Sequence, residues 1–325
     1  MTLEKSLHRF PMVCALIPNW NGRQHILACL QSLSGLHYPK ECLQVLVIDN
    51  GSTDGSVEAI EKFFKEMSLR GFRYNALIKN IENLGAPAAY NQGLRAAHAD
   101  VEFFWKLDND VVVAPDCLGE FVRHMLSAPE NAAGVTGRYI NSRSGREEFS
   151  GAIYLQPPRR WTKILHPVTA TDIEKHRVDC SKLVMISGGC FLFRRSLVEV
   201  YGEFDERFFL YYDDTEFCVR LALRGFRFAI IPRCTIHHYG SASSHSGDMI
   251  KVYYGTRNHL LFGTLIFQWW ERMLFLSLQL AAIPWKLYRV VLQKEGGGKG
   301  AALRAFLDAI VDWICMRYGK WQKME

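Results

Sequence analysis

The chain has 325 residues, 49% of them hydrophobic and 22% charged, which is enough for a large core in one or two domains. Its whole formal net charge of +6 comes from residues 251–325, which hold 11 lysines and arginines against 5 acidic residues. No basic run or nucleic-acid-binding motif accompanies this charge, which argues against nucleic acid as a partner. Nine cysteines in no zinc-binding spacing are typical of buried thiols in a reducing cytosol.

Two features bear on location. Residues 1–10 carry charges and no long apolar segment, so we expect no signal peptide. The longest apolar stretch, residues 273–283, is interrupted by Ser277 and Gln279 and is shorter than the roughly 20 residues that span a bilayer. We therefore expect a cytoplasmic protein. Because the basic tail also holds five of the eight tryptophans, we expect it to lie at the inner face of the membrane.

The first half of the chain alternates between strand and helix patterns. Apolar runs predict strands over residues 13–18, 43–48, 72–78 and 101–107. Apolar stripes at helical spacing predict helices over residues 26–33, 57–67, 85–97 and 118–125. This alternation indicates a mostly parallel α/β sheet, in which ligands bind beyond the carboxyl ends of the strands. Asn19, Asp49 and Asp108 fall at those ends.

The second half has a less regular pattern. Residues 141–180 are polar and predict loops. The remaining predicted elements are strands entered at the Gly188-Gly189 hinge and over residues 226–231, a helix from Asp213 to Leu221, and helices from residue 251 that break at Pro284 and at residues 296–298.

The sequence Asp108-Asn109-Asp110 directly follows the strand 101–107 and holds the chain's one Asp-x-Asp pattern. Two carboxylates one residue apart repel each other unless a cation lies between them, and hard oxygen ligands suit Mg²⁺ or Mn²⁺. A solvated strand end is the alternative. His237-His238, which we place beyond a strand and a short loop, offers a third ligand or a purely structural histidine.

Three further groups of polar residues suit a nucleotide and a general base. Asp49 can accept a hydrogen bond from a base or a ribose, although a helix cap is the alternative. The stretch from Asn83 through Gly85 to Asn91 suits a ribose and phosphates, or forms a plain turn. Asp213-Asp214 begins a helix beside aromatic residues; burial would raise the pKa of these carboxyls and favour a base, whereas the helix dipole favours a simple cap.

Together these stretches resemble the family 2 glycosyltransferases, which have the GT-A fold. The resemblance covers roughly residues 12–245 and rests on residues 16–22, 47–54, 83–93, 107–110, 187–189, 202–206 and 212–214. Residues 190–195 and 238–243 are most similar to the rhamnosyl- and galactofuranosyltransferase branch. No Gln-x-x-Arg-Trp motif follows, so the chain does not resemble the processive cellulose- or chitin-type synthases.

The resemblance implies roles for individual residues. A UDP-, dTDP- or GDP-sugar would be bound by Pro18, Asn19, Asn21, Asp49, Asn83, Gly85, Asn91, Asp108, Asn109, Gly188 and Gly189. A divalent cation, Mn²⁺ or Mg²⁺, would be held by Asp108, Asp110 and His238, with Asp110 the direct ligand and His237 an open alternative to His238. Asp214 would be the catalytic base. Asp213 replaces the usual glutamate of the family, which leaves the division of roles between the two carboxylates open.

The sequence thus predicts an inverting, metal-dependent glycosyltransferase with a glycan or lipid-linked acceptor, acting in cell-surface polysaccharide synthesis. Residues 1–248 would form the GT-A domain. Residues 249–325 would form a helical extension that binds an anionic membrane surface or a second subunit in a homodimer. A sugar nucleotidyltransferase is one alternative, although residues 19–23 fit its glycine-rich basic loop poorly. A non-catalytic sugar-binding or scaffold protein is the other, and it would not need Asp110 and Asp214 together.

Overall fold

The structure is a computed structural model that describes residues 10–155, 164–240, 247–285, 288 and 299–322. Three sequence expectations therefore lie outside the described residues: the absence of a signal peptide in residues 1–9, the branch-typical residues 241–243 and the helix break at residues 296–298.

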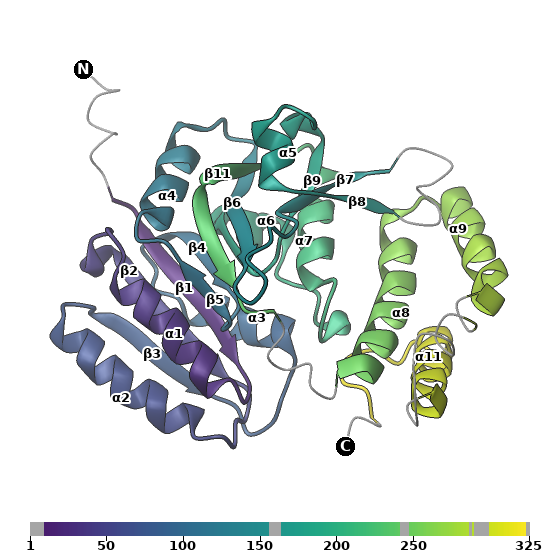
Figure 1. Ribbon diagram of the computed structural model, residues 1–325, viewed down its shortest axis with the longest axis horizontal. Coiled ribbons are helices and arrows are strands. Elements are labelled where there is room, and N and C mark those ends of the chain that lie inside the picture. Colours follow the sequence, from purple (N-terminus) through teal and green to yellow (C-terminus); the bar gives the residue numbers. More distant parts are fainter. Residues whose placement is uncertain (1–9, 156–163, 241–246, 286–287, 289–298, 323–325) are drawn as a thin grey trace.

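An eight-stranded, mostly parallel mixed sheet forms the centre of the molecule (Figure 1). In spatial order its strands are β3 (Tyr74–Lys79), β2 (Leu43–Asp49), β1 (Met12–Asn19), β4 (Val101–Leu107), β10 (Cys190–Arg194), β6 (Ala132–Asn141), β11 (Arg227–His238) and β5 (Val111–Val113). The first four are mutually parallel, as the strand–helix alternation predicted. Strand β10 is antiparallel to both β4 and β6, and β5 is antiparallel to β11. The predicted GT-A class of fold is confirmed.

Helices cover both faces of the parallel strands, which explains why most residues of those strands are apolar. Alternate side chains of β1, beginning with Val13, pack with α1 (Arg23–Ser34), α2 (Ser56–Leu69) and α4 (Cys117–Ser127). The others, such as Leu16, pack against α3 (Ala86–Ala96). A Cβ atom on Gly93 would lie 2.8 Å from the Leu16 side chain, so the glycine lets α3 approach the sheet closely. This packing places the carboxyl ends of β1, β2 and β4 at one edge.

The structure corrects the loop prediction for residues 141–180. Strands β7 (Gly151–Tyr154) and β8 (Leu165–Val168) and helix α5 (Ala170–Glu174) lie in this region, and with β9 (Leu183–Ile186) the two strands form a separate antiparallel sheet. The strands are only four residues long, too short for alternation to stand out from the surrounding polar sequence.

The predicted end of the strand at Ile231 was also wrong. Strand β11 continues to His238 because its pairing with β6 shifts register between Ile231 and Thr235, a bulge that accommodates Pro232. His237 and His238 are therefore consecutive strand residues with opposite orientations, rather than part of a loop.

Helix α7 (Asp213–Ala222), which follows α6 (Arg195–Tyr201) in the chain, packs against the first of the three C-terminal helices that the structure describes, and the other two pack against that first helix (Figure 1). These three helices are α8 (Gly247–Ile266), α9 (Trp269–Ala281) and α11 (Lys299–Ile314). A break at residues 267–268 was not predicted, whereas α9 ends three residues before Pro284. Leu260, Leu261 and Phe262 of α8 belong to the same core cluster as Phe217 of α7. In the described part of the chain, no helix combines the length and the apolar character needed to cross a membrane.

Candidate active site

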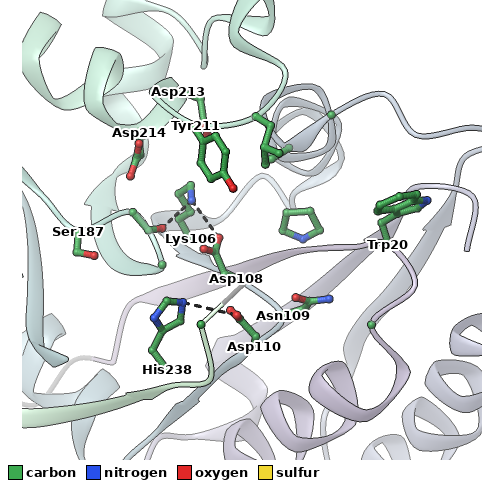
Figure 2. A pocket seen from close by; sticks show the side chains of 18 of the residues that line it. Trp20, Lys106, Asp108, Asn109, Asp110, Ser187, Tyr211, Asp213, Asp214 and His238 are labelled. Atoms are coloured by element: carbon green, nitrogen blue, oxygen red, sulfur yellow. Dashed lines mark hydrogen bonds and ion pairs between the residues drawn. The ribbon is translucent and has the colours of Figure 1, made fainter. Parts of the chain in front are cut away.

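A cleft of about 600 Å³ lies at the carboxyl ends of β1 and β4, between the sheet and the loop that precedes α7 (Figure 2). Most of the residues that the sequence singled out line it. They are Pro18, Asn19, Asn83, Gly85, Asp108, Asn109, Asp110, Gly188, Gly189, Asp213, Asp214 and His238. Segments as far apart in the sequence as Pro18 and His238 thus contribute to one cavity.

One end of the cleft carries a chain of amide and carboxylate side chains. The Asn109 amide donates to Asn19 Oδ1 over 2.8 Å, and the Asn19 amide in turn donates to Asp49 Oδ2 over 2.9 Å. Asp49 is only 1% exposed and also accepts a hydrogen bond from the Ser52 backbone. Asp49 therefore lies behind Asn19 and fixes the orientation of its amide, rather than lining the cleft itself.

Asn83 shapes the turn that leads into α3. Its Oδ1 accepts hydrogen bonds from the Gly85 backbone over 2.9 Å and from the Asn50 amide over 3.3 Å. Gly85 has a φ of +89°, and a Cβ atom there would lie 2.6 Å from the Phe209 carbonyl oxygen. Only glycine is compatible with this contact, so Gly85 brings the start of α3 against the loop before α7.

Besides Asp49, two more of the predicted substrate-binding residues do not line the cleft. Asn21, with a φ of +48°, accepts a hydrogen bond from the Thr53 backbone and connects two loops. Asn91 is buried, and its amide bonds both the backbone carbonyl and the backbone N–H of Phe204, as well as Glu206. Both asparagines hold the local structure together, and we leave them out of the candidate site.

The turn between β4 and β5 points Asp110 towards β11. Its carboxylate is 5% exposed and lies 3.6 Å from Nε2 of His238, as Figure 2 shows. Nδ1 of His238 lies 2.8 Å from the Glu148 carboxylate, which holds the ring in this orientation. His237, the open alternative, is exposed on the other side of the strand.

The pKa values at this edge follow from burial and charge. Burial raises the pKa of Asp110, and the neighbouring His238 opposes that rise. Burial lowers the pKa of His238, but the charge of Asp110 and the hydrogen bond with Glu148 outweigh it, so the net shift is upward. Asp110 thus offers a buried carboxylate oxygen, and His238 offers Nε2 of a ring that Glu148 holds in orientation. This pair of ligands fits Mn²⁺ or Mg²⁺.

The protein alone would supply only part of a cation's ligands. In the portion of the chain that the structure describes, no three histidine, cysteine or acidic side chains are grouped closely enough to hold a metal. Asp108 is partly engaged elsewhere, because its Oδ1 accepts hydrogen bonds from the Tyr90 hydroxyl over 2.7 Å and from Lys106 over 3.3 Å. Asp110 and His238 would therefore hold the cation together with substrate oxygens and water.

Lys106 is a site residue that the sequence reasoning missed. It is 3% exposed and donates to the Gly188 carbonyl over 2.6 Å as well as to Asp108. Burial lowers its pKa, but Asp108, Asp213 and Asp214 together raise it above its usual value, so the ammonium stays charged. A lysine between Trp105 and Leu107, within an apolar stretch of the strand, was the available signal, because lysine is rarely buried without a partner.

Asp213 and Asp214 begin α7 at the opposite wall of the cleft. Burial and the repulsion of Asp214 raise the pKa of Asp213 to about 7, against the effect of Lys106. Burial also raises the pKa of Asp214, again opposed by Lys106. The Asp214 carboxylate lies directly over Gly188, where a Cβ atom would be 1.7 Å from Oδ2, and its Oδ1 accepts a hydrogen bond from the Thr215 backbone. The Asp214 carboxylate is thus held in place, and Asp213, with a pKa of about 7, takes up a proton near neutral pH.

Comparison with known protein families places this cleft in context. Residues 14–202 match the profile described as Glycosyl transferase family 2. The probable glycosyltransferase YdaM of Bacillus subtilis is 23% identical over 243 residues, which are 71% of this chain and 53% of YdaM. N-acetylglucosaminyl-diphospho-decaprenol L-rhamnosyltransferase of Mycobacterium tuberculosis is 26% identical over 231 residues, 62% of this chain and 68% of that enzyme. The chain spans about half of YdaM and 31% of the glycosyltransferase AglE of Haloferax volcanii.

Solved structures share the fold. The mannosyltransferase PcManGT of Pyrobaculum calidifontis, in complex with GDP-Man and Mn²⁺, is 17% identical, with a TM-score of 0.59 over 95% of this chain and 89% of that one. Residues 1–349 of TarS of S. aureus, in complex with UDP-GlcNAc, are 16% identical, with a TM-score of 0.56 over 92% of this chain and 80% of that one.

Proposed function

Because the chain belongs to glycosyl transferase family 2, we propose that it moves a sugar from a nucleoside-diphosphate sugar to a hydroxyl group of a glycan or lipid-linked acceptor, with inversion at the anomeric carbon. The observation that carries this proposal is that one cleft brings together three groups of side chains. They are the amides of Asn19 and Asn109, the candidate cation ligands Asp110 and His238, and the carboxylates of Asp213 and Asp214. The nucleotide sugars bound to PcManGT and TarS, and the lipid-linked substrate named for the mycobacterial rhamnosyltransferase, support the choice of donor and acceptor.

The residues of the cleft divide the chemistry between them. Asn19 and Asn83 would orient the nucleoside, and Asp110 with His238 would hold a divalent cation, which neutralises the charge that grows on the departing diphosphate. Asp214 would accept the proton of the acceptor hydroxyl while the oxygen of that hydroxyl forms the bond to the anomeric carbon. The bond from that carbon to the diphosphate breaks on the opposite side, so the configuration inverts without a covalent intermediate.

A panel of nucleotide sugars, incubated with the full chain and Mn²⁺, tests the proposal. We expect slow release of nucleoside diphosphate from one donor of the panel, which also identifies that donor. A nucleotidyltransferase would instead release pyrophosphate from a nucleoside triphosphate and a sugar phosphate. A non-catalytic sugar-binding protein would release neither product.

We expect the transfer rate to fall as the pH decreases, because Asp214 must be ionised to accept a proton. Burial raises its pKa, so the acidic limb of the kcat/KM profile should lie above the roughly pH 4 typical of an exposed carboxyl. A wild-type limb at about pH 4 would contradict the assignment of the base.

We also propose that α9 and α11 contact an anionic membrane surface, with residues 1–248 as the catalytic domain and residues 249–325 as the membrane-binding extension. Trp269, Met273 and Leu280 lie on one side of α9 and are 77%, 61% and 61% exposed. Leu307, Val311 and Ile314 are exposed on α11. Tryptophan and aliphatic side chains next to basic residues suit the interface of an anionic bilayer. A homodimer interface is the competing use of the same face.

Liposome flotation distinguishes the two uses. The full chain should float with anionic vesicles and less with neutral vesicles or in high salt, since each Lys or Arg near the surface contributes only about 1 kcal/mol and salt screens it. The double variant Trp269→Glu/Met273→Glu should stay at the bottom, and Leu69→Glu, at an exposed position on α2, should float normally. A wild-type chain that does not float but forms a dimer disrupted by the double variant would instead make this face a subunit interface.

A further inference from the structure

The loop that leads into Asp213 has an unusual backbone. Phe209, Tyr211 and Tyr212 have φ values of +61°, +64° and +71°. This left-handed region is unfavourable for residues with a side chain, and aromatic residues rarely adopt it. Three such residues within four positions persist only where the surrounding structure over-determines them. Contacts with α8 and with the start of α3 hold residues 207–212 in this conformation.

Asn258 of α8 contributes the first set of contacts. Its fully buried amide lies within hydrogen-bond distance of three loop carbonyl oxygens, at 2.9 Å from Phe208, 2.8 Å from Leu210 and 2.9 Å from Tyr211. Its Oδ1 accepts a hydrogen bond from Nε of Arg257 over 3.0 Å, which fixes which way the amide faces. A single side chain thus fastens the strained part of the loop.

Arg257 contributes the second set. Its guanidinium is fully buried and donates to the carbonyl oxygens of Arg207 and Phe208, each over 3.0 Å, and to the Gly319 carbonyl over 2.7 Å. It also lies 4.9 Å from the centre of the Tyr254 ring, which stacks on the Phe209 ring of the loop. Because this buried guanidinium donates hydrogen bonds to backbone carbonyl oxygens, it fixes the position of the backbone around it.

The neighbouring groups complete the set of contacts. The Phe209 carbonyl accepts a hydrogen bond from the backbone of Ala86, at the start of α3, over 2.8 Å. The Tyr212 hydroxyl lies 3.1 Å from Nδ1 of His259. Every carbonyl from Arg207 to Tyr211 therefore has a partner outside the loop, and most of those partners belong to Arg257 and Asn258.

The fastened loop forms one wall of the cleft. Phe209, Leu210 and Tyr211 line it, and Figure 2 shows the Tyr211 side chain reaching into the cavity above Asp108. Asp213 and Asp214 follow directly in the chain. Any shift of this loop would therefore move both Tyr211 and the carboxylate pair relative to the sheet, which carries Asp108 and Asp110.

We infer that Arg257 and Asn258 are positioning residues for the transfer reaction. They hold residues 207–212 in the strained conformation that places Tyr211 and the Asp213-Asp214 pair in the cleft, facing the sheet. The C-terminal helices thereby take part in building the active site. This inference rests on the proposed function for its catalytic part, whereas the fastening of the loop can be tested independently.

The test compares two variants of the full chain. Asn258→Leu keeps nearly the same shape and removes the amide that bonds the loop. Leu261→Ala is the matched control, because Leu261 is buried on the same helix in the core cluster and its loss weakens packing without removing a bond to the loop. Amide hydrogen exchange in peptides spanning residues 205–214 should become at least tenfold faster in Asn258→Leu than in Leu261→Ala, once both are compared at equal distance from their melting temperatures.

Kinetics with the donor found in the nucleotide-sugar panel supplies the second readout. Asn258→Leu should lower kcat by a factor of about 10 to 10², as expected for misplaced reacting groups, while the Kd for the corresponding nucleoside diphosphate with Mn²⁺ stays within about twofold. Unchanged exchange in the loop, or a kcat no lower than that of Leu261→Ala, would overturn the inference. If exchange in the loop becomes faster in Asn258→Leu but the wild-type chain transfers no sugar, the role of Asn258 in holding the loop is confirmed. Its role in the transfer reaction is then overturned, and the result counts against the proposed function.

Discussion

Replacing Asp214 by asparagine is expected to reduce the rate of sugar transfer by a factor of about 10² or more, in the range lost with a positioned general base. Asparagine has the same shape and fits the space over Gly188, and it can still accept the hydrogen bond from the Thr215 backbone. It cannot take the proton of the acceptor hydroxyl. Binding of the nucleoside diphosphate and Mn²⁺, measured by calorimetry, should remain close to that of the wild type.

Asp213→Asn is the matched variant for this prediction, because the two carboxyls are adjacent and both line the cleft. We expect it to retain most of the transfer rate at neutral pH, since Asp214, the proposed base, is still present. If Asp213→Asn is inactive and Asp214→Asn nearly active, the base has been assigned to the wrong carboxylate.

Replacing Asp110 by alanine is expected to abolish the Mn²⁺-dependent part of nucleoside diphosphate binding, a loss of about 100-fold or more in affinity. Asp110 is the buried carboxylate that faces Nε2 of His238, and without it one imidazole remains to hold a cation. The fold should survive, because burial raises the pKa of this carboxyl and so marks its ionised form as unfavourable in the protein alone. Calorimetry with and without Mn²⁺ measures the effect.

His237→Ala serves as the control for the proposed cation ligands Asp110 and His238. His237 precedes His238 on the same strand but is exposed on the other side, so its removal should leave Mn²⁺-dependent binding unchanged. His238→Ala should weaken that binding. Equal affinities in wild type and Asp110→Ala would sink the assignment of Asp110 as a cation ligand.

The parallel half of the sheet was predictable because each of its strands and helices has a pattern of apolar residues that can be recognised within a short stretch of sequence. Strands such as β2 are covered by helices on both faces and so consist mainly of apolar residues, as residues 45–48 do. The helices between them carry apolar stripes, as α2 does with Ile60, Phe64 and Met67. Polar residues at the strand ends, such as Asn19 and Asp108, then necessarily meet at one edge. This reasoning located most of the cleft.

The remainder depends on contacts between distant parts of the chain. Asn91 has the same residue type as Asn19, but its amide bonds the backbone of Phe204, more than 100 residues away. Lys106 lies within an apolar stretch of its strand, and its role became visible only when Asp213 and Asp214 were brought close to it. Arg257 and Asn258 lie in the middle of a long helix whose sequence gives no hint that they bond a strained loop.

A crystal structure with Mn²⁺ and the nucleoside diphosphate of the donor that the panel identifies tests the proposed active site most directly. We expect the nucleoside beside Asn19 and Asn83, and an anomalous peak for manganese between Asp110 and the diphosphate, within reach of His238. A nucleotide bound outside this cleft, or manganese bound away from Asp110, would contradict the proposed active site.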